Sequence, residues 1–137
     1  MKYITKSEMR AALKKVAGEN PKFIYTRPDW PVGERAGCSY THEYDAEGNF
    51  VSQSFLGGVG DNVAKSVPGC IVGKVLIEEF KVPVEAFHAS GNTGSYAGGL
   101  DLYSYGFQLE GDAANVADIV QRRQDAGHTW GDAVDGI

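Results

Sequence analysis

A seven-residue stretch with strictly alternating side-chain character, CSYTHEY at 38–44, most constrains the fold of this chain. Successive side chains of a strand point to opposite faces. One face of the predicted strand therefore carries Cys38, Tyr40, His42 and Tyr44. The segment DAEGN (45–49) follows as a turn, and FVSQSFL (50–56) supplies a second strand. The sequence thus predicts an antiparallel hairpin, and we expect its Cys38 side to face the core.

Helices are predicted on both sides of this hairpin in the sequence. Thr5 and Glu8 form a capping box, which begins a helix whose apolar face holds Met9, Leu13 and Val16. The other predicted elements are a strand at 22–27, helices at 70–80 and 113–126 (the latter with Ile119 on its core face), a strand at 101–110 and a short last helix capped by Thr129. This order predicts a single α+β domain over 1–137. We expect a mainly antiparallel sheet of three to four strands, with helices packed on one face.

Charge is distributed unevenly and limits the possible partners. The formal net charge is -5; residues 1–35 contribute +4 (eight Lys/Arg and four Asp/Glu) and the remainder -9. A protein of this charge is a poor candidate for general nucleic-acid binding, which requires a basic surface. A local basic strip formed by Lys6, Arg10 and Lys14 on the first helix leaves weak nucleotide or nucleic-acid binding as an alternative.

No segment approaches the roughly 20 apolar residues that span a membrane. The first ten residues, MKYITKSEMR, contain no apolar core of a secretory signal. We therefore expect a cytoplasmic location, with no membrane contact and with the two cysteines as free thiols.

Three residues offer reactive chemistry. Cys70 follows Pro68-Gly69 at the predicted start of a helix, where the helix dipole lowers a thiol pKa. With Cys70 or Cys38 as nucleophile and His42 as base, the chain would be a small thiol-dependent enzyme. The alternative is that both cysteines pack in the core. Because no close cysteine pair is present, we predict no metal site and no cofactor.

Aromatic side chains among glycines and small polar residues suggest a binding surface. Tyr96, Tyr103, Tyr105 and Asn92 lie in the segment 91–106, and Trp30 lies in a second long loop. Tyrosine and tryptophan combine a flat apolar ring with a polar group, which suits contact with a partner. The alternative is that Tyr103 and Tyr105 face the core from a strand.

The segments CSY (38–40), PGCIVGKVL (68–76) and QDAGHTWGDAV (124–134) resemble a set of small uncharacterised proteins of actinobacteria and their bacteriophages. The resemblance covers about a third of the chain, and it brings no activity or catalytic residue with it. It implies a phage or phage-derived accessory protein acting in the host cytoplasm.

A small binding or regulatory protein without enzymatic activity is the function that these features favour. It would occupy a host protein or a small ligand through the loops around Trp30 and Tyr96. The thiol-dependent enzyme and the weak nucleic-acid binder remain the alternatives.

Overall fold

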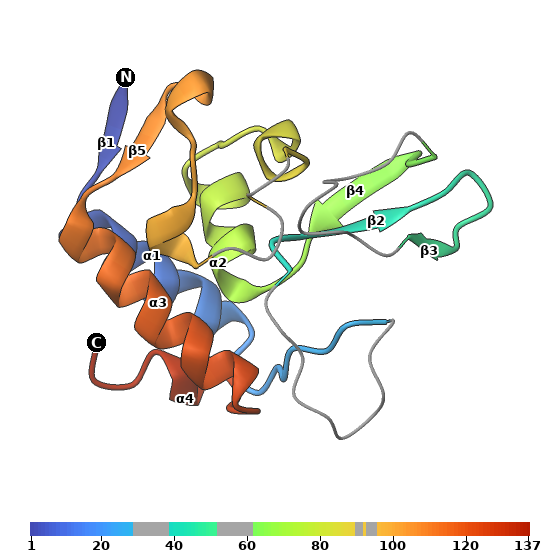
Figure 1. Cartoon of the computed structure of the whole chain (residues 1–137). Helices are drawn as coiled ribbons and strands as arrows, with labels where there is room; N and C mark the ends of the chain where they lie inside the picture. The colour runs from blue at the N-terminus through green and yellow to red at the C-terminus, as the bar shows by residue number, and fades with distance from the viewer. Residues whose placement is uncertain (29–38, 52–61, 90–91, 93–95) are drawn as a thin grey trace.

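The computed structural model describes residues 1–28, 39–51, 62–89, 92 and 96–137 (Figure 1). Within them the α-helices are α1 (Lys6–Glu19), α2 (Ile71–Lys74), α3 (Gly111–Asp125) and α4 (Trp130–Ala133). The strands are β1 (Lys2–Ile4), β2 (Thr41–Tyr44), β3 (Phe50–Val51), β4 (Lys65–Pro68) and β5 (Phe107–Leu109). A π-helix, η1 (Val75–Glu79), continues α2, and 3-10 turns form η2 (Val84–Phe87), η3 (Ala97–Gly99) and η4 (Tyr103–Tyr105).

The α+β class predicted from the sequence is confirmed, but the sheets are small. The strands β3, β2 and β4 form an antiparallel sheet in that order, so the hairpin is confirmed; β1 and β5 form a separate parallel pair. The helices pack mainly against one another, and the antiparallel sheet extends outward from them rather than lying beneath them (Figure 1). The expected arrangement of helices over one sheet face is therefore not what the structure has.

The strands differ from the prediction in three places. Residues 22–27 form no strand, whereas residues 65–68, for which we predicted no strand, form β4. The predicted strand at 101–110 shortens to β5, because a 3-10 turn at Tyr103–Tyr105 ends at Gly106 with a φ of 86°. Residues other than glycine rarely adopt so positive a φ. Gly106 therefore allows the chain to reverse direction between the 3-10 turn and β5.

Helix α1 begins as predicted. The Thr5 hydroxyl accepts from the Glu8 amide, and the Glu8 carboxylate accepts from the Thr5 amide, each at 3.2 Å. The apolar face with Met9, Leu13 and Val16 is buried. In α3, the buried positions include Ala113, Val116, Ala117, Val120 and Gln124, whereas Ile119, which we placed on the core face, is 44% exposed.

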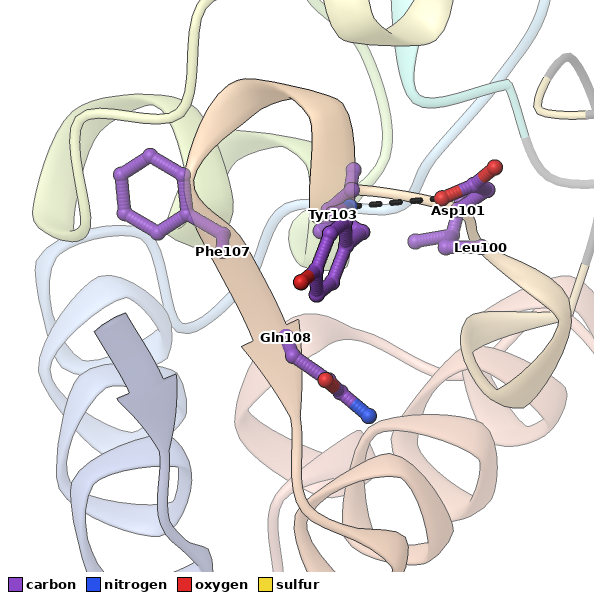
Figure 2. Close-up of a pocket in the computed structure, with 6 residues that line it drawn as sticks. Leu100, Asp101, Tyr103, Phe107 and Gln108 are labelled. Carbon is purple, nitrogen blue, oxygen red and sulfur yellow. Dashed lines mark hydrogen bonds between the residues drawn. The ribbon is translucent and has the colours of Figure 1, made fainter. Parts of the chain in front are cut away.

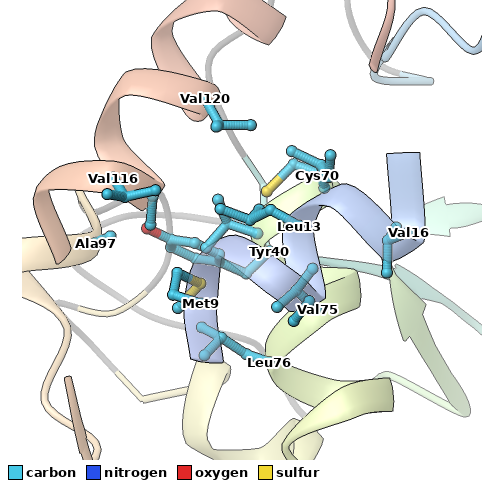
Figure 3. Close-up of a cluster of buried hydrophobic side chains, with 14 of the residues drawn as sticks. Met9, Leu13, Val16, Tyr40, Cys70, Val75, Leu76, Ala97, Val116 and Val120 are labelled. Carbon is cyan, nitrogen blue, oxygen red and sulfur yellow. The ribbon is translucent and has the colours of Figure 1, made fainter. Parts of the chain in front are cut away.

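The core forms where α1, α2 and α3 meet the Tyr40 ring (Figure 3). At this point α2 approaches the chain before β2 so closely that a Cβ on Gly73 would lie 2.0 Å from the Tyr40 carbonyl oxygen. Only glycine permits such backbone contact. Tyr40 itself is buried, and its hydroxyl accepts from Gln121 Nε2 at 3.3 Å.

One buried glutamine ties together the two most distinctive sequence segments. Gln124 Oε1 accepts from the Ile71 amide at 2.9 Å and from Trp130 Nε1 at 3.0 Å. It therefore satisfies the first amide of α2 and anchors α4 at once. Thr129 caps α4 as predicted, with its hydroxyl accepting from the Asp132 amide. Gln124, Thr129 and Trp130 of the QDAGHTWGDAV segment thus have structural roles.

Among the described residues, no helix has the length and apolar character needed to span a membrane.

Candidate functional site

The predicted reactive residues are placed as follows. His42 is half-buried on β2, with Nε2 3.0 Å from the Tyr25 hydroxyl and its ring beside that of Phe50. Burial raises the pKa of the Tyr25 phenol far above its ordinary value, so this hydroxyl stays protonated near neutral pH and is no base. Cys38 and Trp30 lie outside the described residues.

Cys70 was wrongly expected to be a free thiol. It is fully buried at the N-cap of α2, and it is disulfide-bonded. The sequence contains one other cysteine, Cys38. A thiol enzyme attacks with a thiolate, which a sulfur in a disulfide does not supply.

The opposite face of β2 proved to be the more buried one. Thr41 and Glu43 are buried, whereas His42 and Tyr44 are half-buried. Among the described residues of the face we expected in the core, only Tyr40 is fully buried. Tyr40 precedes β2, where the chain still lies against the helices. Alternation identifies the two faces of a strand but does not determine which of them is buried.

Glu43 lies at the centre of a polar cluster that the sequence did not reveal. Its Oε1 accepts from the Thr41 hydroxyl and lies 3.5 Å from Ser66 Oγ and 3.3 Å from His88 Nε2. Ser66 Oγ lies 2.9 Å from the same His88 nitrogen. Residues from β2, β4 and the end of η2 are joined here, and no spacing in the sequence links them.

The cluster of Ser66, His88 and Glu43 is not arranged as a catalytic triad. In a triad the carboxylate and the hydroxyl bind opposite ring nitrogens of the histidine, so the carboxylate orients the base from behind. Here both oxygens contact His88 Nε2. The geometry therefore fits a buried polar network that holds β4 to η2, in which each group has a partner. Nor do three or more His, Cys, Asp or Glu side chains gather as metal ligands in the part of the chain described.

The tyrosine segment, defined as residues 96–108, carries the two most exposed aromatic side chains among the described residues. Tyr96 and Tyr103 are each 66% exposed, and Tyr105 is 37% exposed. The alternative in which Tyr103 and Tyr105 face the core is therefore wrong. The reason is the 3-10 turn, which replaces the expected strand and turns both rings outward. Arg122 of α3 lies 5.8 Å from the centre of the Tyr96 ring, within the range of a cation–π contact.

Asn92 positions this segment instead of presenting a polar group to a ligand. Its side chain is buried; Nδ2 donates to the carbonyls of Ala86 at 2.8 Å and Asp101 at 2.9 Å, and Oδ1 accepts from the Asp101 amide at 2.9 Å. Asp118 of α3 adds a further tie by accepting from the Ala97 amide at 2.8 Å. The exposed tyrosines thus stand on a segment with a fixed backbone.

Replacing Asn92 by alanine is expected to loosen the tyrosine segment and to destabilise the protein. The three hydrogen bonds would be lost, at a cost of about 1–3 kcal/mol for each backbone group left buried without a partner. Urea unfolding gives the loss of stability, and amide hydrogen exchange should be faster at Asp101 than in α1. Exchange at Asp101 that matched the wild-type rate would contradict this role.

A hollow of about 270 Å³ lies beside the tyrosine segment (Figure 2). Leu100, Asp101, Leu102 and Tyr103 line it on one side, and Phe107 and Gln108 of β5 on the other. In Figure 2 the Tyr103 ring points toward Gln108, whereas Phe107 lies on the opposite side of the β5 ribbon. A second, polar hollow of about 320 Å³ is lined by Arg123, His128, Asp132 and Asp135.

Of the two hollows, only the one beside the tyrosine segment combines exposed aromatic rings with apolar walls. Arg123, in the other, donates to the carbonyls of Ala133 and Asp135 and so holds the end of the chain. We therefore take the tyrosine segment and its hollow as the candidate site.

No protein-family model matches the chain, and no match was found among curated proteins or solved structures. The functional assignment therefore rests on the geometry of the described residues.

Proposed function

We propose that this chain is a small binding protein without enzymatic activity, and that the tyrosine segment is its contact surface for a partner. The observation that carries the proposal is the exposure of Tyr96 and Tyr103 on a backbone fixed by Asn92. Large aromatic rings gain free energy when a partner removes them from water. Because the segment is already ordered, little further conformational entropy is lost on binding.

The two alternative functions have less support. The thiol-dependent enzyme would need Cys70 or Cys38 as a thiolate. The Cys70 sulfur is buried and disulfide-bonded, and Cys38 lies outside the described residues. The weak nucleic-acid binder would need the basic strip of α1. Arg10, the middle member of that strip, donates to the Ile137 backbone oxygen at 2.7 Å. A guanidinium held in this way is less available to a phosphate.

The proposal includes a phage context and a cytoplasmic location, and both are supported by sequence features alone. A disulfide at Cys70 does not favour the cytoplasm, since disulfides persist mainly in oxidising compartments. The partner is a host protein or a small ligand, and the role predicted for Trp30 adds a second aromatic contact.

Site-specific photo-crosslinking tests this function. The photoreactive residue benzoylphenylalanine, which resembles tyrosine in shape, replaces Tyr103 in the protein as produced in cells. Illumination is expected to yield one discrete adduct, whose partner is identified by mass spectrometry.

The matched control carries the same photoreactive residue at Ala11, an exposed position of α1 outside the candidate site. The adduct should be absent there, and a Tyr96→Ala substitution should reduce the Tyr103 adduct. A protein with no adduct at 103, or with the same adducts at both positions, would not be using this surface.

A further inference from the structure

Strand β5 has one paired edge and one open edge. On the paired side, the Lys2 amide donates to the Gly106 carbonyl at 2.8 Å, and the Glu110 amide donates to the Ile4 carbonyl at 3.0 Å. In a parallel ladder, alternate residues of a strand bond to the neighbouring strand. Since Gly106 and Glu110 face β1, the backbone groups of Phe107 and Leu109 point away from it.

The open edge carries unused hydrogen-bonding groups. The Phe107 amide donates to the Leu102 carbonyl at 3.2 Å. Within the residues that the structure describes, the Phe107 carbonyl and the Leu109 amide have no hydrogen-bond partner. A strand edge with a free carbonyl and a free amide is a template for another extended chain.

The hollow of about 270 Å³ borders the start of this edge, where Phe107 and Gln108 of β5 line it. Because the Phe107 amide points away from β1 and reaches Leu102, residues 100–103 lie on the far side of β5 from β1. The hollow between them and β5 therefore leaves room beside the edge (Figure 2). Tyr103, 66% exposed, offers an aromatic ring at its border.

Acidic side chains near the edge favour a basic occupant, and Lys2 of the neighbouring β1 is paired with Glu8. Between Lys81 and Arg122 the sequence contains no Lys or Arg, whereas it contains Glu85, Asp101, Glu110, Asp112 and Asp118. Asp101 lines the hollow, and the exposed Glu110 directly follows β5. A chain with lysine or arginine side chains complements this potential. A second copy of this protein would bring the same acidic segment and be repelled.

We propose that the open edge of β5 binds an extended, basic segment of a partner protein, which pairs with Phe107 and Leu109 as an added strand. Main-chain hydrogen bonds would supply affinity and the acidic side chains would supply selectivity, as in other cases of strand addition. This inference rests on the proposed function, because it names the partner class for the same surface.

Nuclear magnetic resonance of the full chain tests the added strand directly. The probe is an acetylated, amidated peptide of alternating lysine and valine, about six residues long, a usual strand length. At about 1 mM, where even weak complexes form, the peptide should shift the Leu109 amide signal and slow its hydrogen exchange. A peptide of alternating glutamate and valine, and a lysine–valine peptide with N-methylated amides, should do neither.

Charge reversal supplies a matched pair of variants. Asp101→Lys is expected to weaken binding of the basic peptide by about fivefold, the effect of one exposed charge pair. Glu47→Lys makes the same change at an exposed position in the turn between β2 and β3, and it should leave binding unchanged. Equal weakening by the two variants would indicate a net-charge effect and overturn the local assignment.

The remaining outcomes separate this inference from the function on which it rests. A discrete crosslink from position 103 with no effect of the basic peptide on Leu109 would overturn the added strand and leave the binding function standing. Equal binding of the acidic or N-methylated peptide would also overturn it. Protection of the Leu109 amide that rises with protein concentration, without peptide, would identify a second copy as the occupant instead.

Discussion

Replacing Gly73 by alanine is expected to cost about 3 kcal/mol or more of the free energy of unfolding, at the upper end of overpacking effects. The new Cβ would lie 2.0 Å from the Tyr40 carbonyl oxygen and 2.7 Å from its carbonyl carbon. These are backbone atoms, so no side-chain rotation relieves the clash. Helix α2 would have to move away from Tyr40, which opens the core. Urea unfolding followed by circular dichroism measures the decrease in the free energy of unfolding. A variant that could not be recovered in folded form would also indicate a large destabilisation.

The matched control is the same substitution in another helix. Gly18 lies in α1, and a Cβ there meets nothing within 4 Å. Gly18→Ala is therefore expected to raise stability by about 0.5–1 kcal/mol, because glycine is a poor helix former. If Gly73→Ala were as well tolerated as Gly18→Ala, the close contact between α2 and Tyr40 would be wrong.

Replacing Gln124 by leucine is the second change with a large expected effect. Leucine has similar volume but no acceptor, so the Ile71 amide and Trp130 Nε1 would both be buried without a partner. Each such group costs about 1–3 kcal/mol. Because the two donors belong to α2 and α4, we expect hydrogen exchange to accelerate at the start of both helices.

Gln108→Leu serves as the control, since Gln108 is exposed on β5. It should change the unfolding free energy by no more than about 0.5 kcal/mol, as is usual for surface positions. A Gln124→Leu protein as stable as this control would rule out the bridging role of Gln124.

Local signals predicted the helices well. The capping box of Thr5 and Glu8 and the Thr129 cap are side-chain to backbone contacts within one turn, so they depend on sequence alone. The exposure of Ile119 on α3 depends on where α1 and α2 lie, which no periodicity within α3 determines. For the same reason the parallel pairing of β1 with β5, residues far apart in the chain, was not foreseen.

The candidate site was predicted by residue type but not by role. Tyr96 and Tyr103 were chosen for their glycine-rich surroundings, and they are exposed. Asn92 was chosen with them, yet its three hydrogen bonds go to the backbone of its own chain. Composition indicates which side chains suit a binding surface, whereas the direction of each side chain depends on the fold. The contact of Glu43 with His88 had no sequence signal, because strand pairing and the η2 turn bring them together.

The parallel pairing of β1 with β5 has a consequence for when the protein can act. The register joins Lys2 to Phe107 and Ile4 to Leu109, so this pair closes a loop of more than a hundred residues. Closing a loop of this length costs conformational entropy, which local contacts do not offset. Such strand pairs therefore form late in folding. During synthesis, β5 leaves the ribosome about a hundred residues after β1. Partner capture at its open edge would therefore begin only after residues 1–109 have been translated, which shields the shorter nascent chain from premature association.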